Sequence, residues 1–308
     1  MLPDPRRSGL GPSIPYDEFG LFRENAEEFG IPWTGPPAVR RVATDLGDGR
    51  RLSALVWGER APELVLLHGG AQNAHTWDTV ALALARPLVC IDLPGHGHSD
   101  AAADGTVNFH RNARDVAHVI RQLAPQARGV VGMSLGGMTT LALVQQSPEL
   151  VRAAVLVDVT PGVDETKASA ITAFVNGPES FPNFEALLAR TIEHNPTRSV
   201  ASLRRGILHN AEQRSDGSWV WRYRRFFEPD RRGSFPRFAE MWDAISAMQA
   251  PLMLIRGMRS AVVDDEDEAE LLRRRPTARV AHVPEAGHSV QGDAPVALAR
   301  LIEGFVFR

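Results

Sequence analysis

Short apolar runs alternate with helical patterns along most of the chain after residue 63. Continuous apolar runs that are separated by helices indicate parallel strands covered on both faces. The predicted strands are residues 64–67, 88–91, 129–133, 153–157, 252–255 and 279–283. The predicted helices are residues 74–85, 108–123, 134–146, 266–274 and 294–305. This order predicts an α/β fold whose sheet is mostly parallel and flanked by helices.

The first part of the chain has a different pattern. Residues 1–37 are rich in proline and glycine around one amphipathic stretch, 16–29, and predict an N-terminal arm with one helix. Two predicted strands follow, 39–44 and 52–57, and the Gly-Asp-Gly sequence at 47–49 between them is a hairpin signal. Such a hairpin would add an antiparallel edge to the sheet.

A long interval, residues 163–245, interrupts the alternation of strands and helices. It holds eleven of the chain's 21 aromatic residues, and its basic part, 198–237, carries ten arginines against four acidic residues. We expect a mostly helical cap, inserted over the carboxyl edge of the sheet, in which most aromatic residues form a small core of their own. Its aromatic residues include Trp219, Trp221, Tyr223, Phe226, Phe227 and Trp242. The predicted domains are an arm at 1–37, a core at 38–162 and 246–308, and a cap at 163–245.

The sequence Gly132-Met133-Ser134-Leu135-Gly136 matches the pattern G-x-S-x-G. A short buried strand precedes the serine and a helix follows it, which is the context of a nucleophile elbow. The serine of such a turn has a strained backbone, so the residues two before and two after it must be small. Both are glycine here, and Ser134 is therefore predicted to be an activated nucleophile.

Reacting groups in an open α/β sheet gather beyond the carboxyl ends of the strands. The sequence His68-Gly69-Gly70 follows the predicted strand 64–67, and its glycines permit close approach of the backbone to a substrate. We expect the N–H groups of Gly70 and Leu135 to form an oxyanion hole, since Leu135 follows the nucleophile directly.

His288 follows the last predicted strand in a glycine-containing loop and is the histidine best placed to act as the general base for Ser134. The histidines of the glycine-rich turns, His68, His96 and His98, need no role beyond hydrogen bonding. No H-E-x-x-H motif or Cys/His cluster is present, so neither a metal ion nor a cofactor is expected.

The acid that would orient His288 has more than one candidate. Asp158 directly follows the predicted strand 153–157, one β-α-β step beyond the nucleophile, and is favoured. The loop after strand 252–255 has Ser260 where an aspartate is expected, and its nearest carboxylates are Asp264 and Asp265. Those two begin an acidic run that also suits a helix N-terminus without any catalytic role.

Composition narrows the class of partner. The net charge of −3 gives no reason to expect nucleic acid or an anionic membrane as a partner. The single cysteine, Cys90, lies in an apolar run and is predicted to be a core residue. The first residues lack the apolar stretch of a signal peptide, and no run approaches membrane-spanning length, so a cytoplasmic location is expected. Nothing in the sequence indicates an oligomeric state.

From residue 38 onward the chain resembles the α/β-hydrolase fold superfamily, and within it small bacterial serine carboxylesterases of the mycobacterial type. The likeness is carried by residues 66–70 (LLHGG), 92–99 (DLPGHGHS), the elbow and Gly287-His288. Some related esterases have their acid after the sixth strand and a serine after the seventh. The resemblance therefore implies that Asp158 is the acid and that Ser260 supports the His–Asp pair by hydrogen bonding.

Together these features predict a cofactor-independent serine carboxylic ester hydrolase with the triad Ser134, His288 and Asp158. The aromatic cap favours a small-molecule ester with an apolar acyl or alcohol group. Thioesterase, C–C bond hydrolase, lactonase and acyltransferase activities use the same acyl chemistry and stay open. A ligand-binding protein that keeps the triad without turnover is a further alternative.

Overall fold

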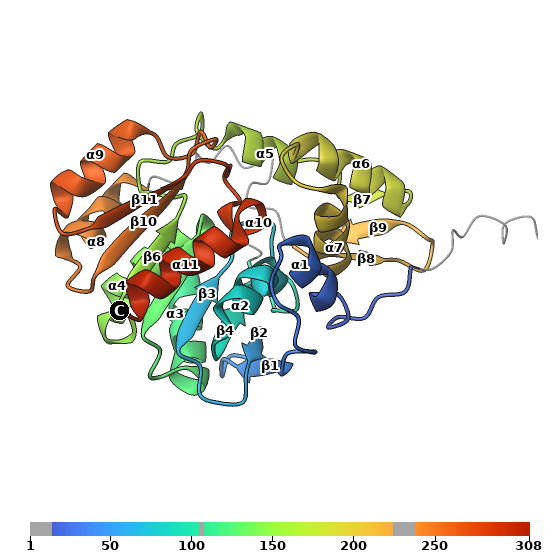
Figure 1. The fold of residues 1–308 in the computed structure, drawn as a ribbon, viewed down its shortest axis with the longest axis horizontal. Coiled ribbons are helices and arrows are strands. Elements are labelled where there is room, and N and C mark those ends of the chain that lie inside the picture. The colour runs from blue at the N-terminus through green and yellow to red at the C-terminus, as the bar shows by residue number, and fades with distance from the viewer. Residues whose placement is uncertain (1–13, 105–107, 224–237) are drawn as a thin grey trace, which may run out of the picture.

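The computed structural model describes residues 14–104, 108–223 and 238–308. A mostly parallel sheet of eight strands runs through its centre (Figure 1). Its strands are β1 (Val39–Asp45), β2 (Arg51–Trp57), β3 (Leu64–Leu67), β4 (Leu88–Ile91), β5 (Gly129–Met133), β6 (Ala154–Val157), β10 (Leu252–Gly257) and β11 (Arg279–Val283). They lie in the order β1-β2-β4-β3-β5-β6-β10-β11.

The antiparallel edge predicted from the hairpin signal is confirmed. Strand β1 pairs antiparallel with β2, and β2 pairs antiparallel with β4, whereas the pairs from β4 to β11 are parallel. Gly47 and Gly49 in the connecting turn have φ angles of 81° and 85°, in the region that glycine adopts without steric cost.

Successive side chains along each strand enter different cores because a strand presents alternate residues to opposite faces. In β3, Val65 and Leu67 pack in one buried cluster and Leu64 and Leu66 in another. The first cluster is covered by α3 (Phe109–Leu123), α4 (Leu135–Gln146), α8 (Trp242–Ala247) and α9 (Asp265–Arg274). The second is covered by α1 (Phe22–Glu28), α2 (Asp78–Leu84), α10 (Val290–Asp293) and α11 (Pro295–Val306), of which α2 and α11 lie in front of the sheet in Figure 1.

The segment predicted as one helix at 74–85 is two elements. It begins as a 3₁₀ turn, η2 (Ala74–Trp77), and continues as α2 from Asp78. The Asn73 side chain accepts a hydrogen bond of 3.0 Å from the His75 N–H, which satisfies a donor that a helix start leaves free. A second 3₁₀ turn, η3 (Pro148–Leu150), links α4 to β6.

The residues between β6 and β10 form an inserted segment that includes a small sheet as well as helices. Its helices are α5 (Ser169–Val175), α6 (Phe184–His194), α7 (Val200–Asn210), η4 (Ala239–Met241) and α8. Its strands are β7 (Ser180–Phe181), β8 (Ala211–Gln213) and β9 (Trp219–Trp221), in the order β7-β9-β8. The sequence predicted a mostly helical segment without this sheet. Its strands have only two or three residues each, too few to show the alternation of apolar and polar residues that predicts a strand.

The inserted segment has a core of its own, separate from the two buried clusters on the faces of the main sheet. Phe184, Leu187, Ile207 and Trp219 pack together in it, as expected for the cap's aromatic residues. Trp242, however, belongs to the main core on the α3 and α4 face of the sheet. The aromatic residues Phe226 and Phe227 lie outside the described residues, and the division into arm, core and cap stays a prediction.

The helix predicted within 16–29 is α1, which joins the main sheet to the inserted segment. The Phe22 ring packs on the Trp57 ring of β2 with centroids 4.8 Å apart. On its other side, the Asn25 side chain accepts a hydrogen bond of 2.7 Å from Nε of Arg205 in α7. Helix α1 therefore links α7 to the main sheet.

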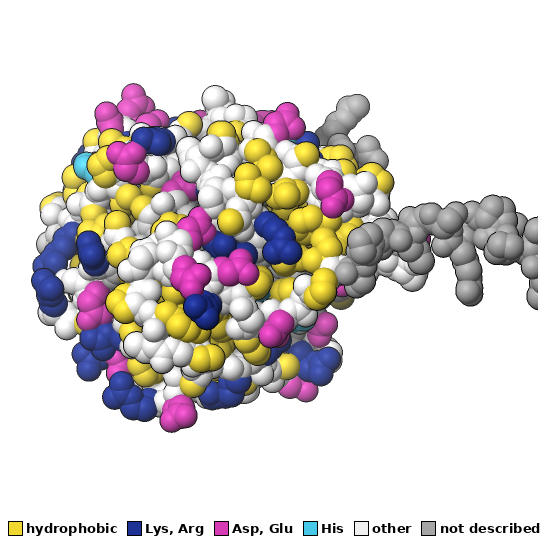
Figure 2. Space-filling view, turned by 45° about the vertical axis from the view of Figure 1, so that its right-hand side comes forward, with side chains coloured by type: hydrophobic (Ala, Val, Ile, Leu, Met, Phe, Trp, Pro, Cys, Tyr) yellow, Lys and Arg dark blue, Asp and Glu magenta, His cyan; other side chains and the backbone are white. Residues whose placement is uncertain are grey.

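Charges of both signs mix on the face of the molecule that Figure 2 shows. Acidic and basic side chains are interspersed on it, and hydrophobic side chains gather at its right. Within residues 14–104, 108–223 and 238–308, no helix has the length and apolarity needed to cross a membrane.

Candidate active site

Ser134 occupies a sharp turn between the end of β5 and the start of α4. Its φ and ψ angles are 50° and −116°, a conformation that costs energy for any residue with a Cβ atom. The turn is held from both sides, because the Ser134 N–H donates to the Val157 carbonyl at 3.3 Å and its carbonyl accepts from the Met138 N–H at 3.0 Å. The strand–turn–helix context predicted for the nucleophile is present.

The two glycines around the serine are required by crowding as well as by backbone freedom. A Cβ atom on Gly132 would lie 2.3 Å from the Gly136 carbonyl oxygen, and one on Gly136 would lie 2.2 Å from the Leu67 carbonyl oxygen. Real Cβ atoms do not approach backbone atoms that closely. The elbow thus packs directly on the end of β3, where the His68-Gly69-Gly70 loop begins.

Asp158 lies beside the nucleophile because of the register of the sheet. Met133 at the end of β5 pairs with Val157 at the end of β6, so Ser134 and Asp158 leave neighbouring strands at the same level. Asp158 is fully buried and also has a positive φ of 50°. Its Oδ1 accepts a hydrogen bond of 2.9 Å from the Gly257 N–H at the end of β10.

His288 completes the arrangement from the loop that follows β11. Its Nδ1 lies 2.8 Å from the Asp158 Oδ2 atom. Since a carboxylate only accepts hydrogen bonds, Nδ1 carries the proton and the lone pair of the neutral ring lies on Nε2. Nε2 is buried and has no hydrogen-bond partner among the residues that the structure describes. The ring is therefore oriented by Asp158 and has a free acceptor atom.

The other candidate residues, which follow β10 in the chain, form hydrogen bonds and ion pairs with residues other than His288. Asp264 caps α9 by accepting from the Asp267 N–H at 2.9 Å and pairs with Lys167 at 2.8 Å. Asp265 is almost fully exposed and pairs with Arg256 at 3.0 Å. The Ser260 hydroxyl accepts from the Val262 N–H at 3.1 Å, which stabilises the turn after β10. Of the carboxylates considered from the sequence, the structure brings Asp158 to His288.

Two buried histidines position the loop that was predicted to carry an oxyanion donor. His68 Nδ1 lies 2.7 Å from the Gly69 carbonyl, and its Nε2 accepts from the Leu93 N–H at 2.9 Å. His96 Nε2 accepts from the Ala71 N–H at 3.3 Å. Burial lowers the pKa of both rings, for His96 to about 3 with a contribution from neighbouring His68. Both rings are thus neutral and serve hydrogen bonding, as predicted for these turns.

The same loop passes close to the nucleophile. A Cβ atom on Gly69 would lie 3.3 Å from the Ser134 Cβ atom and 2.4 Å from Met133 Sδ. Leu135 is the first residue of α4, and the first N–H groups of a helix have no partner within it. Gly69 and Leu135 are therefore adjacent to Ser134. The role of Gly70 and Leu135 as oxyanion donors stays a prediction.

A cavity of about 150 Å³ lies between the inserted segment and the loops of the main sheet. Its walls include Gln72, which follows the glycine loop, and Ser289, which is next to His288, whereas Ser134, Asp158 and His288 do not line it. Phe174 and Trp221 line it from the inserted segment, with ring centroids 5.8 Å apart. Trp219 does not line it, because its ring packs on Phe184 at 5.1 Å in the segment's own core.

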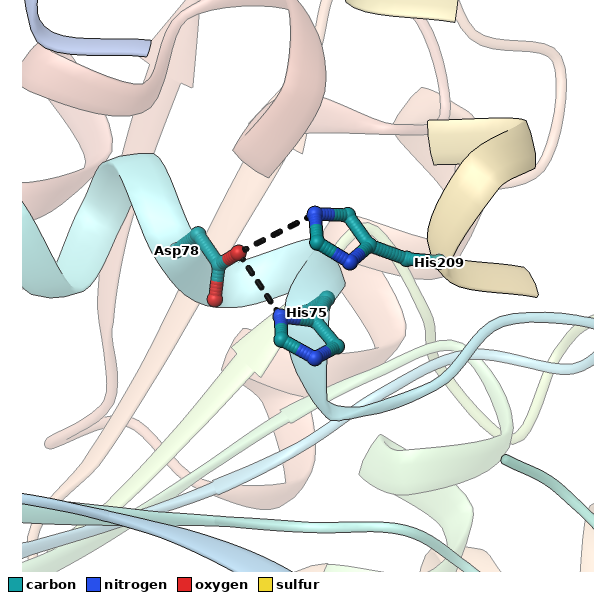
Figure 3. A group of neighbouring side chains, drawn as sticks. All are labelled: His75, Asp78 and His209. Atoms are coloured by element: carbon teal, nitrogen blue, oxygen red, sulfur yellow. Dashed lines mark hydrogen bonds and ion pairs between the residues drawn. The ribbon is translucent and has the colours of Figure 1, made fainter. Parts of the chain in front are cut away.

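Three polar side chains near this cavity, His75, Asp78 and His209, were not predicted from the sequence (Figure 3). The spacing of His75 and Asp78, three residues apart at a helix start, is a signal that places both on one face. His209 lies in α7, far away in the sequence, and no local pattern connects it to the other two.

A family model described as alpha/beta hydrolase fold matches residues 62–295. The chain belongs to the α/β-hydrolase family. It is 45% identical over 312 residues to the esterase Rv0045c of Mycobacterium tuberculosis, covering 99% of this chain and 98% of that protein. A crystal structure of that esterase covers 96% of this chain and 100% of its own at 44% identity, with a TM-score of 0.85.

More distant relatives have varied substrates. The sn-1-specific diacylglycerol lipase ABHD11 of Mus musculus is 27% identical over 76% of this chain and 77% of its own length. A 2-(acetamidomethylene)succinate hydrolase of Mesorhizobium japonicum is 26% identical over 80% of this chain and 88% of that protein. These names describe those proteins, and their variety indicates that the shared fold does not determine the substrate.

The crowding at the elbow predicts a stability difference between two glycine-to-alanine variants. Gly136→Ala should lower the free energy of unfolding by about 1–3 kcal/mol or more, because the new methyl group meets the Leu67 carbonyl. Gly304→Ala in α11 has nothing within 4 Å of its Cβ and should raise it by about 0.5–1 kcal/mol. Urea unfolding measures both, and equal midpoints for the two variants would contradict the close packing.

Proposed function

We propose that this chain is a serine carboxylic ester hydrolase in which Ser134, His288 and Asp158 form the catalytic triad. The observation that carries the proposal is the His288–Asp158 hydrogen bond of 2.8 Å, which leaves Nε2 as the free acceptor. This pair lies at the sheet edge where Ser134 leaves the neighbouring strand. The 45% identity to the Mycobacterium tuberculosis esterase, over 99% of this chain, supports ester hydrolysis as the reaction.

The reaction follows from these positions. Ser134 Oγ attacks the ester carbonyl carbon while His288 Nε2 takes the hydroxyl proton. The carbonyl oxygen becomes an oxyanion, which the N–H groups of Gly70 and Leu135 would stabilise. Collapse of this intermediate expels the alcohol, which receives the proton from His288, and leaves an acyl group on Ser134. Water, deprotonated by His288, then attacks the acyl group, and the bond to Ser134 Oγ breaks as His288 returns the proton to that oxygen and the carboxylic acid leaves.

Asp158 acts through His288 and does not touch the substrate. Both of its oxygens are occupied, Oδ1 by the Gly257 N–H and Oδ2 by His288 Nδ1. The carboxylate thereby selects the tautomer with Nε2 unprotonated and stabilises the imidazolium that forms during the attack. Its complete burial strengthens this interaction, because water does not screen it.

The substrate is proposed to be a small ester with an apolar acyl or alcohol group. Phe174 and Trp221 provide an aromatic wall to the cavity beside the triad. The predicted cap, residues 163–245, would exclude water from the acyl-enzyme and bind the part of the ester remote from the carbonyl. A cytoplasmic location and the absence of nucleic-acid and membrane partners stay predictions from the sequence.

Rates and products with matched substrates distinguish ester hydrolysis from the other acyl-transfer reactions. Turnover of p-nitrophenyl esters of graded acyl length should exceed turnover of matched thioesters, lactones and C–C bonded diketones. Preference for any of those substrates would replace the esterase assignment with the corresponding activity. Ligand binding without formation of an acyl-enzyme would instead identify a non-catalytic binding protein.

The nucleophile assignment predicts the reaction with a fluorophosphonate probe. The probe should label the wild-type chain once, at Ser134, because only an activated serine reacts readily. Ser134→Ala should abolish labelling and ester turnover, and its circular dichroism spectrum should match that of the wild type. Hydrolysis that persists in clean Ser134→Ala protein would end the assignment.

The choice of acid predicts the ranking of three variants. Asp158→Asn should lower kcat by roughly 10⁴-fold, because the amide favours the wrong tautomer of His288. Ser260→Ala and Asp264→Asn should each change kcat far less, since their side chains bond to Val262 and Lys167 instead. A loss of kcat in Asp264→Asn with an active Asp158→Asn would reverse the assignment.

The two tryptophans of β9 form a matched pair for testing the cavity. Trp221 lines it and Trp219 does not. Trp221→Ala should shift the ratio of kcat/KM for medium over short acyl esters by about tenfold. Trp219→Ala should lower the melting temperature and leave that ratio unchanged, because its ring lies in the segment's own core. Equal selectivity in folded forms of both variants would rule out Trp221 as a specificity residue.

A further inference from the structure

A cluster of three buried side chains lies apart from the proposed triad. His75 belongs to η2 and Asp78 begins α2, both in the main fold, whereas His209 lies near the end of α7 in the inserted segment. Figure 3 shows both imidazole rings directed toward the Asp78 carboxylate. All three side chains are more than nine-tenths buried.

The three candidate ligand atoms lie close together. Asp78 Oδ2 lies 2.9 Å from His75 Nδ1 and 3.7 Å from His209 Nε2. The three ligand atoms all lie within 4.8 Å of one another. The two rings are stacked with centroids 3.8 Å apart and planes 11° from parallel, so one ring must turn for both nitrogen lone pairs to meet a single ion.

Hydrogen bonds among the described residues do not satisfy every polar atom of this cluster. His209 Nε2 and Asp78 Oδ1 are buried and have no hydrogen-bond partner among the described residues. Buried polar atoms are almost always paired, so orphaned atoms of two facing side chains indicate a missing partner. A positive ion bound by Asp78 Oδ2 and the imidazoles would supply that partner for His209 Nε2.

The far edges of both rings are held by further hydrogen bonds. Tyr16 Oη lies 2.8 Å from His209 Nδ1. Glu18 Oε1 lies 3.1 Å from His75 Nε2. Histidines that bind metal ions have such a partner on the second nitrogen, which orients the ring and fixes its tautomer. Arg41, the nearby cation, is itself paired with Asp92 at 2.7 Å and with Glu18.

We propose that His75 Nδ1, Asp78 Oδ2 and His209 Nε2 bind one divalent transition-metal ion of the Zn²⁺ type. Ligands at the usual 2.0–2.2 Å from a tetrahedral ion are about 3.3 Å apart, close to the mean of the two distances to Asp78. Two imidazoles and a carboxylate are ligands that Zn²⁺ accepts in proteins. Binding releases the proton that otherwise lies between His75 and Asp78.

The cavity gives the ion a route of entry and a fourth ligand. Both His75 and His209 line it, so water in the cavity can complete the tetrahedron. Because its ligands come from the main fold and from α7, the bound ion would tie the inserted segment to the main fold. This binding does not depend on the proposed ester hydrolysis, since no triad residue takes part.

The test is metal binding by the full chain after treatment with a chelator. Calorimetric titration with Zn²⁺ should give one ion per chain, and Co²⁺ should produce the intense visible absorption of four-coordinate cobalt. His209→Gln should weaken binding by about 100-fold or more, beyond the 10–100-fold loss typical of outer-shell changes. His194→Gln in α6 is the matched control and should bind as the wild type does, because its ring bonds to the Arg190 carbonyl and packs on Phe174, apart from the three proposed ligands.

Two further measurements keep the proposal testable if a variant does not fold. Zn²⁺ should raise the melting temperature of the wild type, since an ion that binds only the native state stabilises it. Tyr16→Phe retains all three ligands and should bind the ion with about 10–100-fold lower affinity. Absent binding, equal affinity in folded His209→Gln, or the weak absorption of six-coordinate Co²⁺ would each overturn the proposal.

Discussion

The close approach of the turn after β5 to the end of β3 is the constraint on which the rest of the site depends. Gly136 lies so near the Leu67 carbonyl that no side chain fits between them. Ser134 is thereby held with a positive φ at the top of the sheet. Strain of this kind persists only where surrounding packing determines it, and here two layers of buried strand side chains supply that packing.

Asp158, His68 and His96 are tolerated as buried polar side chains at this edge because each makes hydrogen bonds within the fold. Asp158 is satisfied by the Gly257 N–H and by His288, and the neutral rings of His68 and His96 bond to the backbone of neighbouring loops. The atoms left without a protein partner are therefore informative. Among the described residues His288 Nε2 is one of them, and a free acceptor is what its proposed role as general base requires.

The inserted segment has a core of its own and also forms part of the cavity wall. Its composition alone did not show which aromatic residues belong to which. Its own core contains Trp219, while Trp221, two residues later on the same short strand, lines the cavity beside the site. Residues two apart on a strand point to the same face, so alternation does not separate these two rings. Their neighbours differ instead, because Trp219 packs on Phe184 and Trp221 packs on Phe174, which also lines the cavity. Helix α1 and Arg205 then hold the segment against the main fold.

The sequence by itself determined the parallel sheet, the edge hairpin and the elbow at Ser134, because these features depend on neighbouring residues and short-range steric rules. It also placed His288 and Asp158 after strands, where side chains meet at one sheet edge. The tertiary structure decided that Asp158 rather than Asp264 contacts His288. It also brought His209 to Asp78, because contacts between distant segments depend on packing that no local pattern encodes.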